Sequence, residues 1–158
     1  MSNNYIEIPN FGYKNEYLAN AIFIFHCIIV LFILLVPFFN IPALLIVHIV
    51  FSICLFIHWI NNSNVCSLTI LEAQLRGLNR TETFSHQFIS PIYDISSTEW
   101  SNIVWIITFV VMCISIYNLY NSDKFKIAMN NYYSIDSNLP FSEKLNQIAC
   151  VFLPLFVL

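Results

Sequence analysis

The sequence predicts an all-α integral membrane protein with three to four transmembrane helices and an amphipathic helix in a polar loop. The first reason is composition, because hydrophobic residues make up 58% of the 158-residue chain and charged residues only 9%. A soluble domain carries roughly 25% charged residues. The second is the pattern of long apolar runs separated by polar stretches, which is typical of membrane-spanning helices. The third is that the chain has only 2 glycines, which favours helices. We expect a single membrane domain, residues 1–158.

The first two apolar runs predict an antiparallel helical hairpin. Residues 18–39 form the first predicted span, which at 1.5 Å per residue covers roughly 33 Å, enough for the hydrocarbon core. The link that follows is too short for anything but a tight turn, and Pro42 suits the first position of a helix. Residues 43–60 form the second span. Trp59 near its end is typical of an interfacial anchor.

The rest of the chain divides by polarity. Residues 1–17 form a polar tail without the basic start and cleavage site of a signal peptide, so we expect it to stay at the membrane surface. Residues 61–101 form a polar loop, residues 102–120 the third span, and residues 121–140 a polar segment in water. The last apolar run is shorter than the roughly 17 residues that a crossing needs. Residues 141–158 are therefore either a fourth transmembrane helix or an interfacial helix.

The charges neither orient the chain nor indicate a polyanionic partner. The net charge is −3 and no basic stripe is present, so nucleic acid is not an expected ligand. With three spans, three basic residues fall on each side, and the positive-inside rule does not decide the orientation. Lys14, Arg76 and Arg80 share one side, and Lys124, Lys126 and Lys144 share the other.

The polar loop contains the pattern of a short amphipathic helix. Thr69 and Glu72 have the spacing of a capping box, in which each side chain accepts from the other residue's backbone N–H. Glu72 and Arg76 are four residues apart, in the favourable order for an ion pair. Gly77 can end the helix in the left-handed conformation. Cys66 is the one polar-loop residue in this stretch for which the helix gives no role.

The same residues carry a family resemblance. Residues 66–72 read Cys-Ser-Leu-Thr-Ile-Leu-Glu and are followed by Arg76, His86 and Pro91. This order resembles a family of small bacterial multi-span membrane proteins of unknown function, whose loop signature reads Cys-Pro-Leu-Thr-x-Leu-Glu and continues with Leu-Arg and His-Tyr-x-x-Pro. Ser67 stands where the family has proline. The resemblance covers residues 18–120.

What the resemblance implies is an architecture with histidines inside the first two helices, which here are His26 and His48. It implies no activity. The Asn-, Ile- and Phe-rich composition is also similar to that of proteins of large DNA viruses. A virion membrane or an internal membrane of the host is therefore an expected location.

Histidines are the candidate cofactor ligands, because imidazole binds haem iron and other metals. The candidates are His26, His48, His58 and His86. Counted from the turn, His26 and His48 differ in depth by roughly 10 Å, so they do not face each other directly. The alternative is that neutral histidines hydrogen-bond across the bundle and hold helices together. The polar residues available for this are Asn20, Ser52, Thr108 and Ser115.

No motif for hydrolytic, nucleophilic or phosphate chemistry occurs in the sequence. The expected function is therefore a structural or assembly component that works through protein–protein contacts. Its partners would be other membrane or virion proteins, or further copies of the chain. The alternative is a haem- or metal-binding redox protein. A transporter is a weaker third reading, since the spans contain no carboxylate for an ion path.

Overall fold

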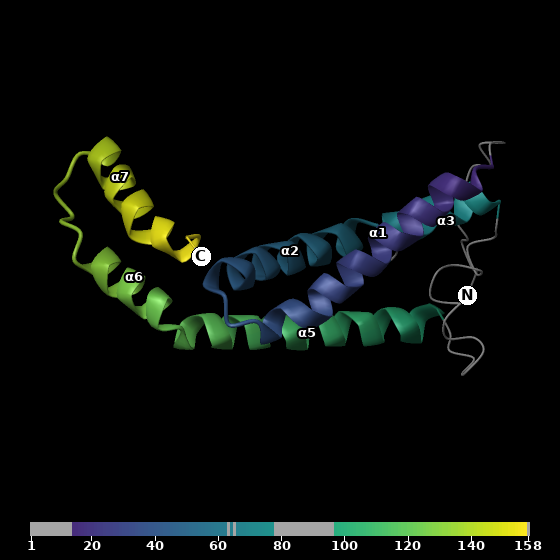
Figure 1. Ribbon diagram of the computed structural model, residues 1–158, viewed down its shortest axis with the longest axis horizontal. Coiled ribbons are helices and arrows are strands. Elements are labelled where there is room, and N and C mark those ends of the chain that lie inside the picture. The colour runs from purple at the N-terminus through teal and green to yellow at the C-terminus, as the bar shows by residue number, and fades with distance from the viewer. Residues whose placement is uncertain (1–13, 63, 65, 78–96, 158) are drawn as a thin grey trace. The chain divides into compact units, whose positions relative to one another are not determined.

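The computed structural model describes residues 14–62, 64, 66–77 and 97–157. All the regular secondary structure in this part of the chain is helical, and the predicted all-α fold is confirmed (Figure 1). His86, and with it the Pro91 segment of the family resemblance, lies outside the described residues.

The first two helices and the turn between them lie close to the predicted positions. α1 spans Glu16–Leu35 and continues as the short 3₁₀ helix η1, Val36–Phe38. α2 spans Pro42–Asn61, so Pro42 is the first helical residue, as its missing N–H favours. α1 begins two residues earlier than the predicted span, because Asn15 starts the helix: its side chain Oδ1 accepts from the N–H of Leu18 at 3.0 Å.

The third long helix, α5, spans Ser97–Asn121 and begins before the predicted apolar segment. Three helical stretches are long and apolar enough to cross a membrane: Glu16–Phe38, Pro42–Asn61 and Ser101–Asn121. In the described part of the chain the number is thus three and not four.

The C-terminal third differs most from the sequence-based expectation. The polar segment at 121–140 contains a helix, α6, at Asp123–Tyr133. α7 spans Phe141–Phe152 and is followed by the 3₁₀ helix η3, Leu153–Leu155. The 12 residues of α7 cover only about 18 Å, too little for a crossing. Pro154 breaks the α-helical pattern soon after, because its ring removes a backbone donor.

The chain divides into two compact units, each described by itself. The first unit is Met1–Leu31 with Leu55–Ile106, and the second is Phe32–Cys54 with Ile107–Leu158. In the first unit, Trp59 is buried against Trp105, with ring centroids 5.5 Å apart. Trp59 is therefore a packing residue in this unit, and its position at the membrane interface stays a prediction.

The three long helices bury polar residues and expose apolar ones. Within the second unit, His48 and Ser52 of α2 and Thr108 and Ser115 of α5 are at most 3% exposed. Isoleucine, leucine, valine and phenylalanine cover the outer surfaces of the same helices; examples are Ile24, Phe25, Ile28, Val50, Ile53, Ile106, Phe109 and Ile116. This is the reverse of a water-soluble bundle.

Candidate functional site

A buried histidine forms the polar centre of the second unit. His48 is fully buried, and its Nε2 lies 3.0 Å from the carbonyl oxygen of Ile33. Its Nδ1 lies 2.9 Å from the hydroxyl of Ser115. The ring of Phe32 covers it, with centroids 5.9 Å apart. One imidazole thus joins α1, α2 and α5.

The sequence explains why the Ile33 carbonyl needs this partner. In an α-helix the carbonyl of Ile33 would accept from the N–H of residue 37, but residue 37 is proline and has none. A carbonyl can only accept, so Nε2 of His48 carries the proton and donates to it. Nδ1 is then the acceptor for the Ser115 hydroxyl. The ring is a neutral tautomer with both nitrogens in use.

A second polar contact holds the same region. The side-chain amide of Asn118 donates to the carbonyl of Pro37 at 2.8 Å. Asn118 lies three residues after Ser115 on α5, so both residues share one helix face. The break in α1 introduced by Pro37 is therefore covered by donors from α2 and α5.

The predicted role of histidine in helix packing is borne out for His48, and Ser115 is the partner among the four proposed. Ser52 and Thr108 are buried in the same unit. The Ser52 hydroxyl has no hydrogen-bond partner within the described residues. Asn20 belongs to the other unit and has a different partner.

A charged centre lies in the first unit. Arg76 Nε donates to Glu72 Oε1 at 2.9 Å, which confirms the predicted ion pair, and its Nη2 donates to Asn20 Oδ1 at 2.8 Å. The side chain of Glu72 is 1% exposed and that of Arg76 is 22% exposed. The second carboxylate oxygen, Oε2, is buried and has no hydrogen-bond partner among the residues the structure describes. Arg76 thereby links the loop helix α3, Ser67–Arg76, to α1.

α3, Ser67–Arg76, is the predicted loop helix, but it begins differently. Cys66 occupies the N-cap position without a side-chain cap, and the N–H of Ser67 donates to Nε2 of His58 at 3.2 Å. Thr69 lies inside the helix, so the capping-box prediction is wrong. His58 of α2 instead provides an acceptor for the first N–H group of the helix, that of Ser67.

The end of α3 agrees with the prediction. Gly77 has φ 66° and ψ 31°, the left-handed conformation that glycine adopts at low cost. The N–H of Asn15 donates to the carbonyl of Leu75 at 3.0 Å, which ties the start of α1 to the end of α3. The Lys14 side chain lies over Gly77, where an added Cβ would meet it.

The predicted cofactor ligands that the structure describes are divided between the two units. His26 and His58 belong to the first unit, His48 belongs to the second, and His86 is not described. To bind a metal through either nitrogen, His48 would have to release Ile33 or Ser115. In the described ranges, no group of three His, Cys, Asp or Glu side chains is arranged to hold a metal ion. Cys66 is half-buried with a free thiol.

Sequence reasoning missed three of these contacts: the Ile33 carbonyl, Asn118 and the cap from His58. The first had a signal in the sequence, since a proline leaves the carbonyl four residues earlier without its donor. The other two depend on which helices meet, and nothing local indicates that.

No family model matches the chain, and no curated protein or solved structure is significantly similar to it. The resemblance to the bacterial membrane family, and the viral source, therefore stay predictions based on the loop motif and the composition.

Proposed function

We propose that the chain is a multi-pass membrane protein in which α1 with η1, α2 and α5 cross the bilayer. The observation that carries the proposal is the reversed distribution of polar and apolar side chains on these helices. Leaving an isoleucine or phenylalanine in water forgoes about 1.5–3 kcal/mol relative to burying it. In lipid the same side chains lose nothing, and the polar groups must then be satisfied inside the bundle.

We further propose that the protein acts as a structural or assembly component through protein–protein contacts. The support is that the buried polar groups hydrogen-bond between helices. Both ring nitrogens of His48 and the side-chain amide of Asn118 are used in this way. A site for intramembrane chemistry would keep such a group available to a substrate. The membrane expected from the composition is that of a virion or a host internal compartment.

Two measurements on the full chain test this proposal. In alkaline carbonate the protein should stay in the membrane pellet and enter solution only with detergent. Release by carbonate alone would rule out the crossing helices. Chemical crosslinking in the intact membrane, followed by purification in mild detergent, should then give discrete adducts with defined partners or with a second copy. A chain that stays entirely monomeric and uncrosslinked would contradict the assembly role while leaving the membrane assignment intact.

An absorption spectrum distinguishes the redox alternative from the structural role. A haem bound through the intramembrane histidines would give a Soret band in the detergent-purified protein, and elemental analysis would detect another metal. A His48→Phe variant that removed such a band would support the alternative, because Phe fills a similar volume without a ligating nitrogen.

A further inference from the structure

The strongest unexplained surface is on the C-terminal helical hairpin of the second unit. α6 and α7 lie side by side and are joined by residues 134–140 (Figure 1). Ile148 and Phe152 on one side of α7 are half-buried, and Leu155 of η3 is buried; Phe152 contacts Tyr132 of α6 with centroids 5.9 Å apart. This side makes the contact that holds the hairpin together.

A second apolar side of α7, continued by Leu153 at the start of η3, is left exposed. Phe141 is 83% exposed, Leu145 56% and Leu153 63%, and Ala149 between them is also exposed. These residues follow one another at intervals of four, so they form a continuous ridge along the helix. We call these four residues the α7 ridge.

The side of α7 that faces away from α6 is polar. Ser142, Glu143, Asn146 and Gln147 are all exposed there, and at 3.6 residues per turn the ridge lies between this polar side and the side that packs on α6. The ridge itself carries no charge. An uncharged apolar side next to a polar side is the pattern of a helix at the boundary between water and hydrocarbon.

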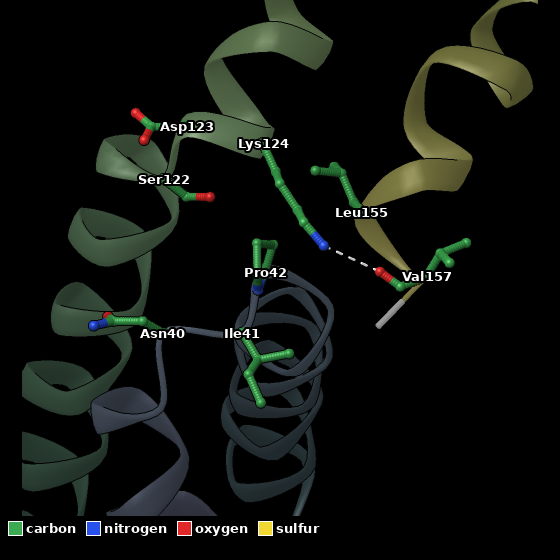
Figure 2. A pocket seen from close by; sticks show the side chains of 8 residues that line it. All are labelled: Asn40, Ile41, Pro42, Ser122, Asp123, Lys124, Leu155 and Val157. Atoms are coloured by element: carbon green, nitrogen blue, oxygen red, sulfur yellow. Dashed lines mark hydrogen bonds between the residues drawn. The ribbon is translucent and has the colours of Figure 1, made fainter.

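The C-terminal end of the ridge is fixed beside the turn between the first two helices. Leu155 is 3% exposed, and Lys124 Nζ donates to the carbonyl of Val157 at 3.2 Å (Figure 2). Together with the turn residues Asn40, Ile41 and Pro42, they line a cavity of about 290 Å³. In Figure 2 the Lys124 side chain extends between Pro42 and Leu155. The end of η3 therefore lies where α1 and α2 reach their turn.

We propose that α7 lies in the headgroup region of the bilayer that the long helices cross, with the α7 ridge toward the acyl chains; this inference rests on the proposed membrane-spanning function. The partner is lipid because η3, at the end of the ridge, is fixed beside the turn of the helices that are proposed to cross the bilayer. Only Ser122 separates α6 from α5, and exposed Phe38, Phe39 and Tyr120 mark the ends of the long helices in the same unit.

The consequence is a fourth membrane contact that does not cross. α6 and α7 then stay on the side of the bilayer where α5 ends. Because Leu155 is fixed at the turn, the ridge enters lipid most deeply at Leu153 and least at Phe141. Since the ridge is uncharged, its attachment depends on apolar area and needs no anionic lipid.

The test uses the full chain in phosphatidylcholine nanodiscs, with one cysteine labelled by an environment-sensitive fluorophore. In a background with the other cysteines replaced by serine, the labels are placed at native Cys113, at Leu145→Cys on the ridge, and at Asn146→Cys on the polar side. Cys113 is exposed on α5, eight residues before its end at Asn121, or about 12 Å into the bilayer. Circular dichroism checks that each labelled variant keeps its helix content.

Lipids that carry a spin label quench a fluorophore at the same depth. We expect mid-chain labels to quench Cys113, labels near the headgroup to quench Leu145→Cys, and neither to quench the neighbouring Asn146→Cys. If Cys113 is quenched while Leu145→Cys behaves like Asn146→Cys, α7 does not contact lipid and the inference is overturned. If Leu145→Cys is shielded from water but unquenched, a protein surface or a second copy covers the ridge, which also overturns it. If Cys113 itself is unquenched, the spanning function fails.

Discussion

The two units each contain a buried polar side chain, and they stabilise it in different ways. In the second unit His48 is fully buried, neutral, and has a partner for each nitrogen. In the first unit the side chain of Glu72 is 1% exposed and forms an ion pair with Arg76, yet only its Oε1 has a partner within the described residues. Both ring nitrogens of His48 thus have a hydrogen-bond partner, whereas only one of the two carboxylate oxygens of Glu72 has one among the described residues.

The difference follows from the cost of burial at each place. Inside a predicted span, no water is present to complete a hydrogen bond, so a neutral ring with two internal partners is the form that fits. α3 is not one of the candidate spans, and Arg76 is 22% exposed, so water can stabilise part of that pair. A buried charged pair therefore costs less free energy there than inside a span, but the stability of the first unit then depends on Arg76 as the partner of Glu72.

The largest expected effect breaks the charged centre. Arg76→Leu removes the only described partner of a buried carboxylate and should lower the free energy of unfolding by about 3 kcal/mol, because an uncompensated buried charge is left behind. Denaturant titration of the protein in detergent micelles measures this loss.

The matched control removes both charges. Glu72→Leu with Arg76→Leu should recover most of the stability, since two apolar groups of similar size leave no buried charge. If the single variant is as stable as the parent chain, Glu72 is solvated by water or by another group, and the contrast between the two units disappears.

The next effect tests the neutral centre. His48→Leu leaves the Ile33 carbonyl without a donor and should cost about 2 kcal/mol in the same titration, since an unsatisfied buried acceptor costs about 1–3 kcal/mol. Ser115→Ala should cost less, about 0.6 kcal/mol, because it removes one hydrogen bond between membrane helices. A larger loss of stability for Ser115→Ala than for His48→Leu would contradict the expectation that the hydrogen bond to Ile33 contributes more than the one to Ser115.

How far the sequence could go is visible in the same elements. The long helices were predictable because an apolar run and a proline at the turn are local signals, and Gly77 fits its left-handed end for the same reason. The start of α3 was not predictable. Thr69 and Glu72 matched a capping box, but the helix starts at Ser67, whose N–H donates to His58 of α2. A tertiary contact overrode a local motif.

α6 shows the opposite failure. Its residues were assigned to a polar segment because Asp123, Lys124, Lys126 and Asn130 cannot be buried cheaply in lipid. Polarity alone does not distinguish a loop from a helix. The helix has an apolar side formed by Phe125, Ala128 and Tyr132. This side stabilises α6 only when α7 packs against it.

A smaller effect sharpens the explanation for His48. In Pro37→Ala the backbone N–H returns, so the Ile33 carbonyl can regain its helical partner. His48→Leu should then cost about 1 kcal/mol less in the Pro37→Ala background than in the parent chain. The measurement is a double-mutant cycle by denaturant titration, with Asn118 unchanged. Strict additivity would show that the two residues do not share that carbonyl.

The last prediction concerns a single amide, at the start of α3. His58→Phe keeps an aromatic ring but removes the acceptor for the Ser67 N–H, and one partly exposed hydrogen bond is worth about 1 kcal/mol. Hydrogen exchange at the Ser67 amide should therefore accelerate about fivefold. Thr69→Ala is the matched comparison, because the Thr69 hydroxyl would accept from the N–H of Glu72 if threonine were the cap. If Thr69→Ala accelerates exchange at the Glu72 amide and His58→Phe leaves exchange at Ser67 unchanged, the capping box holds α3 after all, and α2 has no part in starting it.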